Sequence, residues 1–277
     1  MADLAIPERY NLATGEPGAA RLRLLQRIFG PATQALLKRA GLREGMRVVD
    51  VACGIGTVSQ AMAREVGPWG LVVGVDSSAA QLEVARADAA TAGVRNIEFV
   101  RASAYETGLE HGAFDLVFCR FVLCHLQRPL DALREMRALL KPGGVLVCED
   151  MEAVALTTVP PTPVYADLAM RVVERGVQRG VDSNLGAKLP SHLREIGMQD
   201  VQVNVWQPAF LSGEEKRWWE YSVAEAAPQV VEMGLATQDE IDAMLEEMRR
   251  VNADESIVLL LPRQWQVWGR LAVQAVR

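Results

Sequence analysis

The amino-acid sequence predicts an α/β protein built on a doubly wound sheet, and three observations point to it. Between about Met46 and Glu149, short runs rich in β-branched residues alternate with longer segments of helical period. The short runs are apolar almost throughout, as strands are when both faces of a parallel sheet are covered. The first run passes through the small-residue loop Ala52–Gly56 directly into a helical segment, as in the repeated units of such sheets.

Five of the apolar runs are expected to be parallel strands: Arg47–Val51, Leu71–Val75, Ile97–Val100, Phe114–Phe118 and Val145–Cys148. Three segments between them have apolar positions three and four apart and are expected to be crossover helices: Thr57–Glu65, Ala79–Thr91 and Leu130–Leu139. Lys141–Gly144 ends the third helix, because proline cannot continue it and glycine tolerates the turn. Two further strands are expected at Val201–Trp206 and Gln264–Val273.

Three segments fall outside this alternation and are expected to be helical additions. They are residues 1–40, the Pro-rich residues 157–190 and the acidic residues 212–253. The first of them is expected to contain a helix over Ala19–Ala40. Because ligands bind at the carboxyl ends of the strands, additions at these places can fold over that edge as a lid or cap. We expect a single domain over 1–277, with a lid at 1–40, a core at 41–156, cap insertions at 157–190 and 212–253, and further core at 191–211 and 254–277.

Composition narrows the class of protein. Half of the residues are hydrophobic and 23% are charged, with Gly 22 and Pro 13, which predicts a globular chain. The net charge of −6 and the absence of a Lys/Arg cluster argue against a nucleic-acid partner. No apolar run approaches the roughly 20 residues of a membrane span, and the start has no basic segment followed by an apolar one, so we expect a cytoplasmic protein. Four cysteines without a Cys-x-x-Cys pair predict reduced, buried thiols.

The loop after the first strand is the most informative segment. Gly54 and Gly56 lack a Cβ atom, so a ligand can approach the backbone, and the following helix start offers N–H groups to an anion. A Gly-x-Gly by itself is equally compatible with a tight turn that binds nothing. Asp76, at the end of the second strand, favours a ligand site, because its carboxylate can accept hydrogen bonds from both hydroxyls of a ribose. A cofactor that carries a nucleoside is therefore expected.

NAD is the poorer candidate for that cofactor. A dinucleotide fingerprint needs a third glycine where this chain has Ser59, and the carboxylate of Asp50 would repel a pyrophosphate.

These motifs, in this order, resemble those of the class I S-adenosylmethionine-dependent methyltransferases over nearly the whole chain. The matching segments are Asp50–Gly56, Asp76, Phe114–His125 and Leu139–Gly144. The resemblance is strongest to small-molecule enzymes of the quinone-biosynthesis type. It implies S-adenosylmethionine as cofactor and a Rossmann-like, seven-stranded sheet whose last strand is antiparallel, with helical cap additions.

The resemblance also implies roles for residues at the matching positions. The cofactor-binding set would be Tyr10, Asp50, Ala52, Cys53, Gly54, Gly56, Asp76, Ser77, Ser103, Ala104 and Arg120. Tyr10, with Gly15 and Arg21, resembles a lid segment in which an aromatic ring approaches the sulfonium, although a terminal ring packed on the cap is also compatible. Two departures stand out, because the family usually has glycine at Ala52 and an acid at Ser103.

Methyl transfer needs alignment more than a protein nucleophile. His125 follows the fourth strand and is the best placed general base of the three histidines, with a structural turn residue as the alternative. His111 and His192 are expected at the surface, and no metal is expected, because Cys119, Cys124 and His125 lie too close in sequence to surround an ion. Aromatic and Met residues of the third addition could line an acceptor pocket or form the core of the cap: Trp218, Trp219, Tyr221, Met233, Met244 and Met248.

We therefore expect methyl transfer to the oxygen, nitrogen or carbon of an apolar small molecule, in secondary metabolism. A second hypothesis keeps the fold without the reaction, as a sensor or a cyclase-like catalyst. An RNA or protein methyltransferase is disfavoured by the charge. The sequence leaves the oligomeric state open, a homodimer included.

Overall fold

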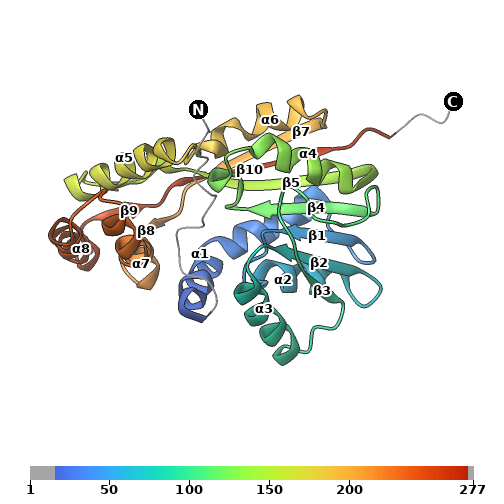
Figure 1. The fold of residues 1–277 in the computed structure, drawn as a ribbon, viewed down its shortest axis with the longest axis horizontal. Coiled ribbons are helices and arrows are strands. Elements are labelled where there is room, and N and C mark those ends of the chain that lie inside the picture. Colours follow the sequence, from blue (N-terminus) through green and yellow to red (C-terminus); the bar gives the residue numbers. More distant parts are fainter. Residues whose placement is uncertain (1–15, 274–277) are drawn as a thin grey trace, which may run out of the picture.

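A seven-stranded sheet forms the centre of the protein, and the computed structural model describes residues 16–273 (Figure 1). The strand order is β3-β2-β1-β4-β5-β10-β7. The strands are β1 (Arg47–Val51), β2 (Leu71–Asp76), β3 (Ile97–Arg101), β4 (Phe114–Arg120), β5 (Leu140–Glu152), β7 (Gln199–Trp206) and β10 (Arg263–Arg270). The first five pair in parallel, and β10 pairs antiparallel with both β5 and β7. The predicted doubly wound sheet with an antiparallel last strand is confirmed.

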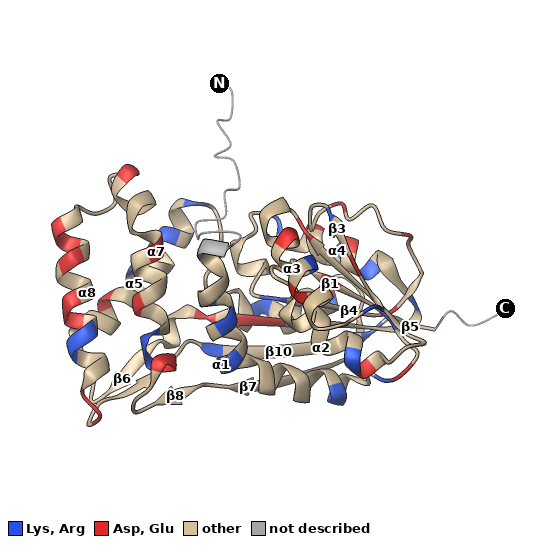
Figure 2. Ribbon diagram, turned by 90° about the horizontal axis from the view of Figure 1, so that it is seen from below, with Lys and Arg blue, Asp and Glu red and all other residues tan. Residues whose placement is uncertain are grey.

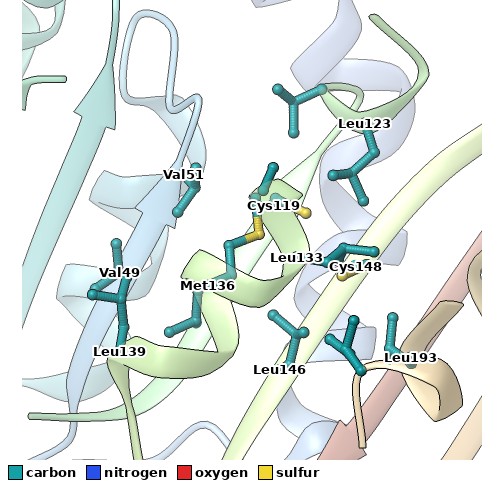
Figure 3. Packing of buried hydrophobic residues seen from close by; sticks show 14 of the residues in the cluster. Val49, Val51, Cys119, Leu123, Leu133, Met136, Leu139, Leu146, Cys148 and Leu193 are labelled. Atoms are coloured by element: carbon teal, nitrogen blue, oxygen red, sulfur yellow. The ribbon is translucent and has the colours of Figure 1, made fainter. Parts of the chain in front are cut away.

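Helices cover both faces of this sheet (Figure 1). One face carries α1 (Glu16–Ala40), α2 (Thr57–Val66) and α3 (Ala79–Thr91). The other carries α4 (Pro129–Leu139) and α6 (Leu189–Glu195). Both faces of β1 are buried because successive side chains of a strand point to opposite sides. Val49 and Val51 pack with Met136 and Leu139 of α4 (Figure 3). Val48 packs on the other side, with α1 and α2.

The remaining helices lie beyond one end of the large sheet (Figure 1). They are α5 (Pro163–Gln178), α7 (Trp218–Glu232) and α8 (Gln238–Ala253), and a small antiparallel sheet joins them, made of β6 (Thr157–Val159), β9 (Val258–Leu260) and β8 (Ala209–Phe210). We call these six elements the cap. All of them except β6 contribute to one apolar core with α1, in which the ring of Phe29 lies 5.9 Å from that of Trp218. Short 3-10 turns complete the chain at η1 (Leu123–His125), η2 (Ala153–Ala155), η3 (Leu185–Lys188) and η4 (Glu214–Arg217).

The structure differs from the prediction in three places. Lys141–Gly144 lies within β5, where the pairing with β4 shifts register between Phe114 and Leu116, so the expected turn is an irregularity of the strand. The last strand ends at Arg270 and not at Val273. The small sheet was not expected, because its strands of two and three residues are too short to show an alternating pattern.

Lys and Arg positions are distributed over several elements of the described chain, and acidic positions follow α8 (Figure 2). Asp239, Asp242 and Glu246 are exposed there, as expected for a solvated helix face. The four cysteines are free thiols, of which Cys53 is half-buried and the others are buried. No helix within residues 16–273 combines the length and apolar character needed to cross a membrane.

Candidate active site

A cavity of about 640 Å³ lies between the carboxyl ends of the strands and the cap. Its walls come from the segments that follow β1, β2, β3 and β4, from α1, and from α5, α7 and α8. The strand order reverses between β1 and β4, and such a reversal leaves a crevice at the carboxyl edge of a sheet. The fold therefore creates the cavity where the sequence motifs predicted a ligand site.

The loop between β1 and α2 forms one wall of the cavity. Ala52, Gly54 and Gly56 all have positive φ angles, of 61°, 56° and 71°. A Cβ atom on Gly56 would lie 2.8 Å from Cζ of Phe99, so the packing of β3 excludes any other residue there. Gly56 therefore shapes the loop from behind and does not itself line the cavity. Ala52, in contrast, holds a left-handed conformation that is strained for a residue with a Cβ atom.

Asp76 ties this loop to the end of β2. Its Oδ2 accepts a hydrogen bond of 2.8 Å from the Gly54 N–H, and its Oδ1 accepts one of 2.9 Å from the Ser78 N–H. Burial raises the pKa of the carboxyl, and the backbone N–H groups of Ser78 and Gly54 oppose that rise. Each carboxylate oxygen has a second lone pair, so Asp76 can still accept bonds from a ligand in the cavity that it lines.

Asp50 lies beneath the loop as a buried carboxyl group. Its Oδ2 accepts a hydrogen bond of 2.5 Å from Ser59 Oγ. Burial raises the pKa of Asp50 to about 7, against the lowering effects of Ser59 and Arg120. This side chain therefore changes charge near neutral pH, beside the cavity.

Arg120, at the end of β4, connects the cavity to α1. Its guanidinium donates to Thr33 Oγ1 at 2.9 Å and to Gln26 Oε1 at 3.0 Å. Thr33 in turn donates to Glu149 Oε2 at 2.6 Å. Burial lowers the pKa of Arg120, and the nearby Glu149 and Asp50 raise it. Arg120 therefore holds α1 over the edge of the sheet as well as lining the cavity.

The predicted adenine-binding residues lie at the ends of β2 and β3. Ser77 and Ser103 are exposed and Ala104 is half-buried, and all three line the cavity. Ser103 Oγ accepts a hydrogen bond of 3.2 Å from the Tyr105 N–H. Sequence reasoning missed Gln81, whose buried Oε1 has no partner among the described residues. The sequence could not have predicted this, because a single glutamine in a helix is usually an ordinary surface residue.

His125 lies in η1 and lines the cavity. Burial lowers the pKa of its imidazole to about 4, with smaller contributions from Arg179 and Arg21. The ring is therefore neutral at pH 7 and offers one donor and one acceptor nitrogen. His111 is exposed and lies 3.4 Å from Glu135, as expected for a surface residue, whereas His192 is half-buried in α6.

The cap supplies the apolar part of the cavity. Trp218, Trp219 and Met244 line it, whereas Tyr221, Met233 and Met248 do not. Three cap arginines that also line the cavity were missed by the sequence reasoning: Arg171, Arg175 and Arg179.

Phe121 was also missed, because nothing in its sequence context signals a special backbone. Its φ is 54°, a left-handed conformation that is rare for a bulky residue. Its ring packs edge-on against Phe29 of α1 at 5.0 Å. This strained residue lines the cavity directly after Arg120, where it connects β4 to η1.

The structure thus brings together most of the predicted site residues. Around one cavity lie Asp50, Ala52, Cys53, Gly54, Asp76, Ser77, Ser103, Ala104, Arg120 and His125. Gly56 lies behind the loop, and Tyr10 lies outside the described residues. Within residues 16–273, no three His, Cys, Asp or Glu side chains are grouped as a metal ion would require.

Known proteins are similar to this chain in sequence and in fold. Demethylmenaquinone methyltransferase of Staphylococcus aureus is 37% identical over 133 residues, which are 48% of this chain and 52% of that protein, so the chain spans about half the length of the curated relatives it matches. A crystal structure from Bacillus halodurans is 21% identical with a TM-score of 0.61, over 86% of this chain and 98% of the other. The 4+2 cyclase SpnF is 19% identical with a TM-score of 0.55, over 96% of this chain and 86% of the cyclase.

The family assignment rests on a longer match than any one relative provides. A family model described as a methyltransferase domain matches residues 42–219, which is more than half of the chain and includes β1 to β7. The two solved structures support the fold alone. The chain belongs to the methyltransferase domain family, and within it resembles the class I enzymes of quinone biosynthesis.

Proposed function

We propose that this protein binds S-adenosylmethionine in the cavity and transfers the methyl group to an apolar small molecule held against the cap. The observation that carries the proposal is the meeting of the Ala52–Gly56 loop, Asp76 and Arg120 around one cavity whose other wall is apolar. The relative from Staphylococcus aureus, a demethylmenaquinone methyltransferase by name, supports methyl transfer to a small acceptor.

The residues present suit that cofactor. Asp76 has spare acceptor capacity for the two hydroxyls of a ribose, and the open backbone at Gly54 leaves room beside it, since a Cβ there would approach only Leu22, at 3.8 Å. Gln81 adds an unpaired acceptor near the start of α3. When bound, S-adenosylmethionine would supply a methyl group on a sulfonium for in-line displacement.

The chain itself would contribute position and the exclusion of water. Trp218 and Trp219 cover the cavity from α7, and the Arg120 network holds α1 against the strand ends. A neutral His125 can accept a proton from an acceptor, although a pKa of about 4 makes it a weak base. Alignment of the acceptor therefore carries more of the catalysis than proton transfer does.

Calorimetry on protein freed of bound ligand tests the first half of this proposal. We expect S-adenosylmethionine and S-adenosylhomocysteine to bind, and NAD not to bind. A purified protein that binds neither of the first two would contradict the proposal. For the second half, a panel of phenols, quinols and amines should yield S-adenosylhomocysteine in proportion to the methylated product.

A protein that keeps the cofactor but transfers no methyl group is the alternative that this assay separates. The strained Ala52 and the missing acid at Ser103 favour it, because both alter the cofactor side of the cavity. Cofactor binding without product across the whole panel would support a sensor or a cyclase-like catalyst. A nucleic-acid acceptor is disfavoured by the net charge of −6.

A further inference from the structure

Three arginines occupy the side of α5 that faces the cavity. Arg171, Arg175 and Arg179 are four residues apart, so one helical face carries the first two and its C-terminal end carries the third. Like charges at this spacing destabilise a helix. Helix stability therefore does not explain this row of arginines, which leaves the groups that the row faces as its explanation.

The first and third arginines have charged or polar neighbours. Arg171 lies near Glu240 of α8, whose pKa is lowered mainly by hydrogen bonds to Thr237 and further by this arginine. Arg179 is close enough to His125 to lower the pKa of the imidazole. Arg21 of α1, which also lines the cavity, donates to Glu225 of α7 at 2.7 Å.

Arg175 differs from both, because neither its Nε nor its Nη2 atom makes a hydrogen bond or ion pair with any residue from 16 to 273. Burial lowers its pKa, and Arg179 lowers it further. The two unpaired nitrogens lie on the same edge of the planar guanidinium, so their N–H bonds point in the same direction. That edge matches the two oxygens of a carboxylate.

Both nitrogens are covered by neighbouring protein atoms. A ligand would reach them after the side chain turns toward the cavity that Arg175 already lines, and no bond to Nε or Nη2 within the described chain opposes that turn. The turn would also relieve the cost of burying two charged donors without partners.

The surroundings of Arg175 define the rest of the ligand. Leu168 and Val172 of α5 and the indole rings of Trp218 and Trp219 line the same cavity. These surfaces suit an aromatic or aliphatic body and offer little to a sugar or a peptide. A ligand that satisfies both parts of the wall combines an apolar body with a carboxylate.

We propose that the acceptor is an apolar carboxylic acid whose carboxylate binds the Nε and Nη2 edge of Arg175, with Arg179 adding positive charge and the tryptophans holding the apolar body. This inference rests on the proposed function and narrows its substrate class. The cofactor also carries a carboxylate, so the test must show which of the two molecules Arg175 binds.

Calorimetry with matched pairs tests this inference directly. The probes are 1-naphthylacetic acid, 3-indolepropionic acid and dodecanoic acid, each against its primary amide, in the presence of saturating S-adenosylhomocysteine. The amides have nearly the same size and lack the charge. We expect the parent protein to bind at least one acid about tenfold or more tightly than its amide. A tenfold preference corresponds to the weakest hydrogen bonds that are made to a charged group.

Variants assign the preference to a residue. Arg175→Gln should remove it, and Arg175→Lys should keep part of it, because lysine keeps the charge without the two-donor edge. Arg134→Gln, at an exposed position of α4, is the matched control for net charge and should keep the preference. Thermal unfolding of each variant checks that it is folded. If Arg175→Gln does not fold, Arg175→Lys takes its place as the test variant.

Several results would overturn the inference. They are equal binding of every acid and its amide, a preference that survives Arg175→Gln, and an Arg175→Gln variant that loses S-adenosylhomocysteine affinity as strongly as acid affinity. The last result would assign Arg175 to the cofactor. Failure of the parent to bind S-adenosylhomocysteine would instead overturn the proposed function, and the acid pairs measured without it would still decide the role of Arg175.

Discussion

At the scale of single residues, Asp76 performs two tasks with one carboxylate. It accepts the N–H groups of Gly54 and Ser78, which shapes the loop, and it keeps lone pairs for a ligand. A substitution at this position therefore reports on both the loop and the site. The two effects separate when binding and stability are measured on the same variants.

We expect Asp76→Ala to weaken S-adenosylhomocysteine binding by about 10- to 100-fold, corresponding to roughly 1.5 to 3 kcal/mol for hydrogen bonds to a charged group. Calorimetry measures the affinity, and urea unfolding measures the stability. Asp88→Ala, on the outer part of α3 beside Arg23, is the control and should leave the affinity unchanged. An unaltered affinity in Asp76→Ala would remove this residue from the site.

Ala52 is strained at a position where the family usually has glycine. Its φ of 61° costs about 1 to 2 kcal/mol for a residue with a Cβ atom, part of which is offset because glycine loses more entropy on folding. Ala52→Gly should therefore raise the free energy of unfolding, by up to about 1 kcal/mol. It should also tighten cofactor binding, since a methyl group leaves the wall of the cavity.

The matched control is Ala87→Gly, at an exposed position inside α3. Because a right-handed helix favours alanine, this change should lower the stability by about 1 kcal/mol. Urea unfolding measures both variants. A loss of stability in Ala52→Gly comparable to that in the control would show that position 52 carries no strain.

At the scale of elements, Lys216 holds the cap together from within. The residue is fully buried in η4, and its ammonium donates to the backbone oxygens of Leu211 at 3.0 Å, Asp254 at 2.7 Å and Ile257 at 2.7 Å. These oxygens belong to the segment before η4 and to the segment between α8 and β9. One side chain thus joins the start of α7 to the end of α8.

Lys216→Met keeps the apolar stem but leaves these three backbone oxygens, of which that of Ile257 belongs to a buried residue, without their donor. We expect a loss of about 3 kcal/mol in the free energy of unfolding, since each unsatisfied group costs about 1 to 3 kcal/mol and part of this is relieved by water. Lys188→Met removes the ion pair of an exposed lysine with the half-buried Asp182 and should cost less than Lys216→Met, about 1 kcal/mol. Equal stabilities of the two variants would refute the role of Lys216.

At the scale of the whole molecule, buried ionisable groups couple stability to pH. Burial raises the pKa of Asp50 to about 7 and that of Asp150 to about 6, so each stays protonated in the folded chain after the unfolded chain has released the proton. Folding is therefore weakened as pH rises from about 4 to 7. His125 acts in the opposite direction, because its pKa of about 4 lies below that of the unfolded chain.

Asp50→Asn removes the first of these contributions. The stability of this variant relative to the parent should increase by more than about 1 kcal/mol between pH 4.5 and pH 8, because one pKa unit corresponds to about 1.4 kcal/mol. Urea unfolding at four pH values measures it. A stability difference between Asp50→Asn and the parent that does not change with pH would contradict the burial of a protonated Asp50.

His125→Asn should instead become more stable relative to the parent as pH falls from about 6.5 to 4, because the buried imidazole resists protonation.

The predicted elements that proved correct share a physical cause. Parallel strands covered on both faces are apolar over most of their length, so β1, β2 and β4 were visible as nearly continuous apolar runs such as Leu71–Val75. The loop before α2 was visible because its geometry demands glycine, as the contact of Gly56 with Phe99 shows. These are local requirements, and they leave a local mark in the sequence.

The elements that were missed have no such mark. In the small sheet β9 pairs with β6, about 100 residues earlier in the chain, and with β8, about 50 residues earlier, and each strand is too short to carry a pattern. The left-handed conformation of Phe121, and the lack of a partner within residues 16–273 for Nε and Nη2 of Arg175, depend on tertiary packing. Neither residue differs from an ordinary phenylalanine or arginine when read in sequence.

By itself the sequence determined the doubly wound sheet, the order of its motifs and the acidic, glycine-rich edge where a nucleoside cofactor is expected. Only the tertiary structure decided how α5, α7 and α8 enclose that edge, and which side chains of the cap face the cavity. The physical reason is the range of the interactions. Strand burial and turn geometry act on neighbouring residues, whereas the wall around Arg175, Trp218 and Trp219 forms only when segments far apart in sequence pack together.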